Sequence, residues 1–239
     1  MAAKPDDAPK RFYKSSQAAP LDGGFGVMLD SRAVRTPKGA RLALPTEALA
    51  DLIAREWDAQ GDKINLAAMP ATRLAFTAVD GVAAARAGTC AEIVRYAGAD
   101  LLCYFAEAPR TLVARQELLW IPLLDWADRA LGVRLVRVAG IRHQPQPEAS
   151  LERLADIAAA TDDFGLAGLA YGVGLYGSAI LALAVREGEI GAEAAFDVSR
   201  LDEAFQEEQW GFDDEAAART ANRRVEAVML GQWFKALSV

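Results

Sequence analysis

The sequence has 239 residues, of which 52% are hydrophobic and 25% are charged, a composition that supplies a folded core and excludes general disorder. Its formal net charge of −7 repels phosphate backbones, so we expect no nucleic-acid partner. The single histidine, His143, and two isolated cysteines, Cys90 and Cys103, are too few for a metal cluster, and any Ser-His-Asp triad would have to use His143.

The first ten residues mix basic Lys4 and Lys10 with acidic residues and do not look like a targeting segment. They contain no apolar run, and two of them, Asp6 and Asp7, are acidic. A secretory signal needs an apolar stretch, and transit peptides are poor in acidic residues. We therefore expect a cytoplasmic protein whose cysteines are reduced, small and buried.

Short β-strands are predicted over residues 11–43, because apolar runs there alternate with turn-forming Gly, Pro and Asp. The runs are residues 12–13, 25–29, 33–34 and 42–44. Thr46 is predicted to cap a helix that ends near Gly61, since apolar residues recur at helical spacing between them.

Helices dominate from about residue 70. They are expected at residues 71–79, 82–96, 111–131, 148–160, 163–186, 192–209 and 213–236. Pro122 predicts a kink or a break, and the alternation of apolar and charged residues over 133–138 predicts a strand. Segregated elements of this kind are typical of an α+β fold. We expect a β-rich N-terminal domain with one helix over residues 1–68 and a larger, mainly α-helical domain over residues 69–239.

The segment from Gly172 to Gly177 matches the glycine pattern of dinucleotide-binding loops, G-x-G-x-x-G. That chemistry requires a strand before the glycines, whereas the residues before Gly172 are rich in Ala and Leu and favour a helix. Close packing of two helices against small residues is the simpler interpretation. The alternative is a small cytosolic enzyme with a ligand pocket near Gly172–Gly177.

A 20-residue stretch without charge, Leu166–Val185, is long enough to cross a bilayer. The acidic pair Asp162-Asp163 precedes it, and no basic residue flanks it on that side. A helix that is apolar on every side is also typical of the centre of a helical bundle. We expect a buried central helix and no membrane insertion.

Acidic and aromatic residues are concentrated near the C-terminus. Glu203 and Glu207 would lie one turn apart on a helix, followed by Trp210, Phe212 and Asp213. Charge runs are usually solvated helix faces, but an aromatic side chain rimmed by charge is typical of a protein-binding surface. Trp57, between Glu56 and Asp58, repeats the mixture, although a lone helical Trp is more often part of the core.

Several segments, in this order and spacing, resemble the assembly chaperones of ATP synthase known as the ATP-twelve family. One of them is Ser199-Arg200-Leu201-Asp202-Glu203-Ala204-Phe205-Gln206 followed by Gln209-Trp210-Gly211. The others are residues 56–60, 69–74 and 100–104, and the set Gln116, Trp120, Pro122 and Trp126 with Gly140-Ile141. The resemblance runs from about Phe12 to beyond Trp210.

The resemblance implies a chaperone that binds the unassembled α subunit of the catalytic sector and prevents its aggregation until the β subunit joins. It implies no catalysis and no cofactor, and a monomer is the natural state for such a helper. The partner-binding residues it implies are Glu203, Glu207, Trp210 and Asp213, with Trp57 as an N-terminal candidate. We hypothesise that these residues form one patch.

Overall fold

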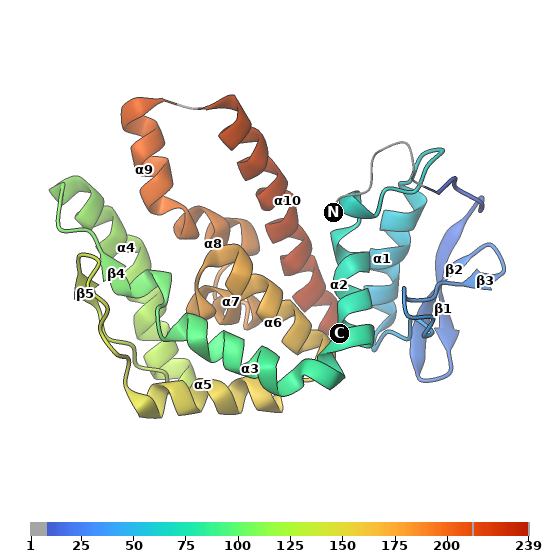
Figure 1. Ribbon diagram of the computed structural model, residues 1–239, viewed down its shortest axis with the longest axis horizontal. Coiled ribbons are helices and arrows are strands. Elements are labelled where there is room, and N and C mark those ends of the chain that lie inside the picture. The colour runs from blue at the N-terminus through green and yellow to red at the C-terminus, as the bar shows by residue number, and fades with distance from the viewer. Residues whose placement is uncertain (1–8, 212, 239) are drawn as a thin grey trace. The chain divides into compact units, whose positions relative to one another are not determined.

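A three-stranded sheet comes first along the chain and helices dominate after it (Figure 1) in the computed structural model, which describes residues 9–211 and 213–238. β1 (Ser16–Leu21), β2 (Gly24–Leu29) and β3 (Arg32–Ala33) form an antiparallel sheet in that order. β4 (Tyr104–Phe105) and β5 (Val138–Ala139) form a small parallel pair. The predicted α+β class is confirmed.

The helical part contains more and shorter helices than the sequence predicts. The α-helices are α1 (Glu47–Asp58), α2 (Pro70–Thr77), α3 (Ala83–Ala97), α4 (Arg110–Trp126), α5 (Glu148–Ala160), α6 (Asp163–Tyr176), α7 (Ala179–Arg186), α8 (Ala192–Ser199), α9 (Leu201–Trp210) and α10 (Asp214–Leu237). Two short 3₁₀-helices are η2 (Leu66–Ala68) and η4 (Leu101–Cys103). Two short π-helical segments are η3 (Ala78–Val82) and η5 (Ala127–Leu131). The predicted helices 163–186 and 192–209 are each two helices.

Three of the predicted strands are wrong. Residues 42–44 make only an isolated bridge, between Leu44 and Phe25. Residues 12–13 are not a strand, because Tyr13 enters the core and its hydroxyl donates to the carbonyl oxygen of Trp57 at 2.6 Å. Residues 133–137 are not a strand either. There, Val136 N–H donates to Gln146 Oε1 at 2.6 Å, and Arg134 N–H donates to Ser150 Oγ at 3.0 Å. Side chains thus satisfy backbone groups that a neighbouring strand would otherwise bond.

The start of α2 is bonded to α1 by a carboxylate. Glu56, near the end of α1, accepts hydrogen bonds from Ala71 N–H at 2.8 Å and Thr72 N–H at 2.7 Å. The Thr72 hydroxyl donates to the same carboxylate at 2.7 Å. Pro70 opens α2, so these N–H groups belong to its first turn, where no helical acceptor exists. Burial raises the pKa of Glu56 above its ordinary value.

The apolar stretch Leu166–Val185 is divided between α6 and α7. The helix stops at Gly177, whose φ of +67° suits glycine, and restarts after Ser178, whose Oγ accepts from Leu181 N–H at 3.0 Å. Every residue of α7 from Ala179 to Val185 is buried. No helix in the described part of the chain is both long and apolar enough to cross a membrane.

The glycine motif lies at the α6 helix, so it lacks the preceding strand that dinucleotide binding requires. A Cβ atom at Gly172 would meet Ala182 Cβ at 3.0 Å and Leu230 Cδ2 at 3.1 Å. A Cβ atom at Gly174 would meet nothing within 4 Å. Gly172 therefore permits close helix packing, as the simpler interpretation of the motif predicts.

A fully buried carboxylate, Asp100, connects the end of the α3 region to α7. It accepts from Leu102 N–H and from Ile180 N–H, each at 3.1 Å. Burial raises its pKa to about 6, although hydrogen bonds from Ser178 and from backbone amides oppose the shift. Asp100 therefore supplies acceptors for the first turn of a buried helix.

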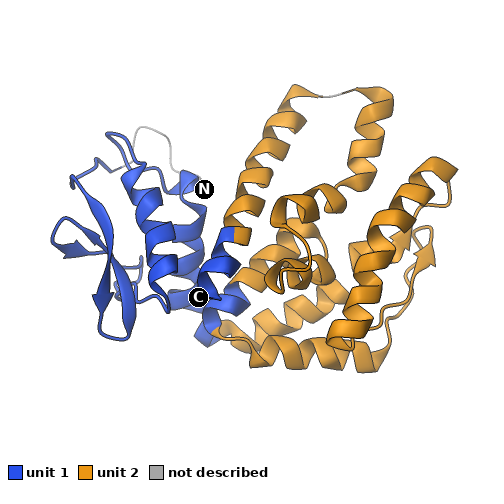
Figure 2. Ribbon diagram, turned by 180° about the vertical axis from the view of Figure 1, so that it is seen from behind, with its two compact units in different colours: residues 1–84, 163–167, 232–239 blue, residues 85–162, 168–231 orange. Residues whose placement is uncertain are grey.

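Backbone contacts group the described residues into two units, coloured separately in Figure 2. Unit 1 holds the three-stranded sheet, α1 and α2, together with residues 163–167 and the last residues of α10. Unit 2 holds residues 85–162 and 168–231. The predicted domain boundary at residue 68 stays a prediction.

Asp100→Asn should change how stability depends on pH. Because the folded state binds the Asp100 proton up to about pH 6 and the unfolded chain releases it near pH 4, this site stabilises the fold at low pH and loses that contribution as pH rises. Relative to the variant, we expect the wild type to lose up to about 3 kcal/mol in free energy of unfolding between pH 4 and pH 6.5. Urea unfolding at several pH values measures this, and a constant difference would contradict it.

Alanine at the two motif glycines should have unequal effects. Gly174→Ala should stabilise the protein by about 0.5–1 kcal/mol, because alanine favours a helix and the site has room. Gly172→Ala should be less stable than Gly174→Ala by about 1–3 kcal/mol, because its Cβ is overpacked. Thermal and urea unfolding of the pair decide it, and equal stability would argue against close packing at Gly172.

Candidate functional site

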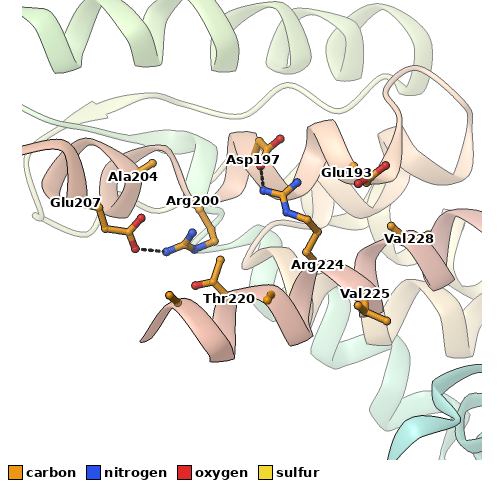
Figure 3. Close-up of a pocket in the computed structure, with 11 residues that line it drawn as sticks. Glu193, Asp197, Arg200, Ala204, Glu207, Thr220, Arg224, Val225 and Val228 are labelled. Atoms are coloured by element: carbon orange, nitrogen blue, oxygen red, sulfur yellow. Dashed lines mark hydrogen bonds and ion pairs between the residues drawn. The ribbon is translucent and has the colours of Figure 1, made fainter. Parts of the chain in front are cut away.

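A groove lies between α8 and α9 on one side and α10 on the other (Figure 3), with a volume of about 600 Å³. Its apolar lining consists of small side chains, and its polar lining is largely charged. The lining residues are Glu193, Asp197, Arg200, Ala204, Glu207, Ala217, Thr220, Ala221, Arg224, Val225 and Val228. All of them belong to unit 2. An apolar strip bordered by charge suits an amphipathic polypeptide better than a small polar substrate.

The corner between α8 and α9 creates one wall of the groove. Helix α8 ends before Arg200, whose backbone (φ −109°, ψ 19°) is not helical, and α9 starts in a new direction at Leu201. The Arg200 guanidinium donates to Glu207 Oε1 at 2.7 Å, and both side chains are largely covered. This ion pair along α9 therefore fixes the position of the Glu207 carboxylate in the groove.

A second ion pair joins α10 to α8 across the groove. Arg224 reaches from α10 to Asp197, as Figure 3 shows, and its guanidinium lies over the Phe196 ring at 5.3 Å from the centroid. The hydrogen bond to Asp197 raises the pKa of Arg224, and Glu193 adds to the effect. Three carboxylates and two guanidinium groups line the groove, so its charge is slightly negative.

The first turn of α9 is attached to α4 through a buried amide. Gln116 on α4 is fully buried; its Nε2 donates to Asp202 Oδ1 at 2.7 Å and its Oε1 accepts from Ala106 N–H at 2.8 Å. Asp202 is half-buried, and this burial raises its pKa, as does the neighbouring charge of Glu203. Because the Gln116 amide has partners on both sides, it sets where α9 begins.

Further contacts hold α8 and α9 against α4. Trp120 is buried, and its indole N–H donates to the carbonyl oxygen of Val198 at 3.2 Å. On the surface, Arg115 pairs with Glu208 at 2.8 Å and lies over the Phe205 ring at 5.3 Å from the centroid. Two of the sequence blocks that resemble the family are therefore in contact, although Gln116 and Asp202 are 86 positions apart in the chain.

Trp210 is the most exposed aromatic side chain of α9. It is the last residue of that helix and is 80% exposed. Gly211 follows with φ +88° and ends the helix, donating its N–H to the carbonyl oxygen of Glu207 at 2.9 Å. An indole left in solvent at the end of a helix is an apolar surface that a partner could cover.

The remaining predicted residues have different surroundings. Glu203 is exposed on α9 and does not line the groove. Asp213 caps α10, because its Oδ2 accepts from Ala216 N–H at 3.1 Å. Phe212 lies outside the described residues. The structure thus brings Glu203, Glu207, Trp210 and Asp213 onto α9 and the segment after it, within unit 2.

Trp57 belongs to unit 1 and is buried, with 7% exposure. Its ring meets that of Tyr13 edge-on, with centroids 5.9 Å apart, and its carbonyl oxygen accepts from the Tyr13 hydroxyl. These contacts explain Trp57 as a core residue of unit 1. A role of Trp57 in partner binding stays a prediction.

Side chains with catalytic or metal-binding potential are sparse in the described residues. No group of three or more His, Cys, Asp or Glu among them is arranged to hold a metal ion. Cys103 is buried, as expected, and burial raises the pKa of its thiol, whereas Cys90 is only half-buried. A buried thiol with a raised pKa is a poor nucleophile.

In sequence, this chain is similar to chaperones. A family described as ATP12 chaperone protein matches residues 10–128. The mitochondrial atp12 protein of Schizosaccharomyces pombe is 25% identical over 224 residues, which cover 89% of this chain and 77% of the relative.

Solved structures define the family. The crystal structure of Atp12 from Paracoccus denitrificans has a TM-score of 0.88 and 42% identity, covering 95% of this chain and 97% of that one. A structure from Agrobacterium tumefaciens has a TM-score of 0.90 and 42% identity, covering 96% and 86%. The chain belongs to the ATP12 chaperone family, and the resemblance drawn from its sequence is confirmed.

Several groove or support residues were not singled out from the sequence, among them Arg200, Asp202 and Arg224. Arg200 and Asp202 lie inside the quoted C-terminal block, so the signal was present but their partners were not. Arg224 lies in a charged stretch of α10 with no motif around it. Its pairing with Asp197 depends on how two helices meet, and no spacing rule along one helix predicts it.

Removing the buried amide of Gln116 should destabilise the protein. Gln116→Leu leaves the half-buried Asp202 carboxylate and the Ala106 N–H without their partner, which should cost about 2–4 kcal/mol. Gln206→Leu makes the same chemical change on the exposed face of α9 and should stay within about 0.5 kcal/mol of the wild type. Urea unfolding measures both, and equal effects would contradict the assigned role of Gln116.

Proposed function

We propose that this chain binds the unassembled α subunit of ATP synthase and prevents its aggregation until the β subunit joins. One observation carries the proposal: in a member of the ATP12 chaperone family, an indole that is 80% exposed ends the helix that forms one wall of an apolar groove. The client would place apolar surface in this groove and against Trp210.

The chemistry of the groove supports temporary binding. Its apolar strip is built from Ala and Val side chains, which give less burial energy per residue than large aromatics. Its arginines already have intramolecular partners, so a client gains little from them. A surface with one large aromatic anchor and a polar rim favours the modest affinity that a hand-over to another subunit requires.

We also propose that the chain acts as a monomer in the bacterial cytoplasm, without catalysis and without a cofactor. The two bacterial relatives of known structure, each 42% identical, support this setting, whereas the fission yeast relative is mitochondrial. The enzyme alternative would place a ligand near Gly172. The close approach of Ala182 and Leu230 to that glycine, and the absence of a leading strand in the described α6 region, argue against it.

Trp210→Ser should weaken binding of the α subunit. Co-expression of the chain with the α subunit, followed by co-purification and a titration of affinity, should give at least about a tenfold loss for this variant, typical of losing an aromatic anchor. Its thermal stability should stay near that of the wild type, because the indole is in solvent. Ile141→Ser removes a fully exposed apolar residue away from the groove and serves as the matched control.

Charge reversal at Glu203 and at Glu207, measured in the same binding assay, distinguishes the contributions of the two residues. Glu203→Lys reverses an exposed charge that lies beside Asp202, whereas Glu207→Lys also breaks the ion pair with Arg200. If the wild type leaves the α subunit insoluble and unbound, the proposed function is wrong. If Trp210→Ser and Glu203→Lys both bind like the wild type, the function stands and the α9 surface is the wrong site.

A further inference from the structure

The N-terminal sheet has one edge long enough to take another strand. β3 is two residues long, whereas β1 has six, and β2 is occupied on both sides. β1 bonds β2 along one side. Among the described residues no strand pairs with its other side.

Hydrogen bonds elsewhere in the sheet establish which groups of β1 face outward. Phe25 N–H donates to Leu44 O at 2.9 Å and Phe25 O accepts from Leu44 N–H at 2.7 Å, so the polar groups of Phe25 turn away from β1. Pro20, opposite Phe25, is then a position that does not bond to β2. By alternation the same is true of Ala18 and Ser16, whose N–H and C=O groups face outward.

These outward groups have no partner among the residues that the structure describes. None of the hydrogen bonds found there ends on the backbone of Ser16 or Ala18 from the open side. The Ser16 hydroxyl is buried and also lacks a hydrogen-bond partner in the described part. Pro20 has no N–H to offer, which limits the open ladder to its N-terminal half.

A groove runs beside this edge, between β1 and α1. Its volume is about 340 Å³, and it is lined by Ser16, Gln17, Ala18, Asp51, Ala54, Arg55 and Asp58, all within unit 1. Ser16 and Ala18 lie opposite Leu29 and Val27, so their side chains share the face on which those residues are buried. Because Ser16 and Ala18 are small, they leave space that larger residues would fill.

The charges at the rim indicate the kind of segment that fits. Asp51 has no ion pair among the described residues, and Asp58, which is 65% exposed, meets Arg11 only at 3.5 Å. Arg55 is the single basic side chain of the lining. Two carboxylates beside one guanidinium favour a partner that carries Lys or Arg.

We propose that β1 binds an extended segment of the client polypeptide as an added strand, with a small apolar side chain in the groove and a basic one at Asp51. The main-chain groups of Ser16 and Ala18 supply the hydrogen bonds, so recognition depends on extended backbone more than on exact sequence. Pro20 keeps the added ladder short, which suits release. The proposal rests on the proposed function for the client, the α subunit.

Amide hydrogen exchange of the wild type with and without the α subunit tests the proposal. Binding should slow exchange at Ser16 and Ala18 by at least about tenfold, since each N–H gains an acceptor. Gln17 and Ala19 already bond to β2 and should change much less. Binding without this alternating protection would overturn the inference and leave the proposed function intact.

Two proline variants test the same edge by affinity. Ala18→Pro removes an outward N–H without breaking a bond to β2 and should weaken binding by about tenfold. Pro20→Ala restores an outward N–H and should bind at least as well as the wild type. Wild-type affinity in Ala18→Pro would overturn the inference, and the exchange experiment decides if that variant does not fold.

Two other experimental outcomes would overturn the inference for different reasons. If the wild type does not bind the α subunit at all, the proposed function fails, and this inference fails with it. If Ser16 and Ala18 are protected without the α subunit, and sedimentation gives the mass of a dimer, a second copy of the chain occupies the edge and the client proposal is wrong.

Discussion

The first N–H groups of a buried helix need acceptors, and in this protein carboxylates supply them. Asp100 does so for α7, a helix whose residues 179–185 are all buried and which α4 and α8 pack against. Glu56 does so for α2 in unit 1. Water cannot reach these helix ends, so an unpaired amide there would cost about 1–3 kcal/mol each. The positions of α7 and α2 therefore each depend on a carboxylate from another segment of the chain.

The same principle of pairing buried polar groups extends to the groove. Gln116 has partners on both sides and places the start of α9, while Trp120 bonds the end of α8. With α8 and α9 held on α4, the outer face of α9 is free to carry charge and the exposed Trp210. The interior contacts thus give rigidity to a surface whose own residues contribute little to stability.

The two surfaces proposed for client binding use different chemistry. The α8–α10 groove offers apolar side chains and charge, which suits a helical or irregular surface of the client. The β1 edge offers backbone hydrogen bonds, which suit an extended segment and depend little on its side chains. Each of the two surfaces is small. If both proposals hold, two weak contacts in different units would allow the client to be released in steps.

Local signals in the sequence determined the class of the fold, most helices, the Thr46 cap and the family. Periodicity and turn residues act over a few positions, so they predict elements without requiring distant partners. They failed at residues 133–137, where Gln146 and Ser150 satisfy the backbone. The apolar run Leu166–Val185 was also predicted as one helix, although Gly177 and Ser178 supply the glycine stop and the serine cap at which it divides into two.

Only the tertiary structure decided which candidate residues are exposed and what holds them. The sequence named Trp57 and Trp210 for the same reason, an aromatic beside acids, yet one is buried at 7% and the other exposed at 80%. The pairs Arg224–Asp197 and Gln116–Asp202 join residues on different helices. Such contacts depend on how helices pack, which no short-range pattern along the chain records.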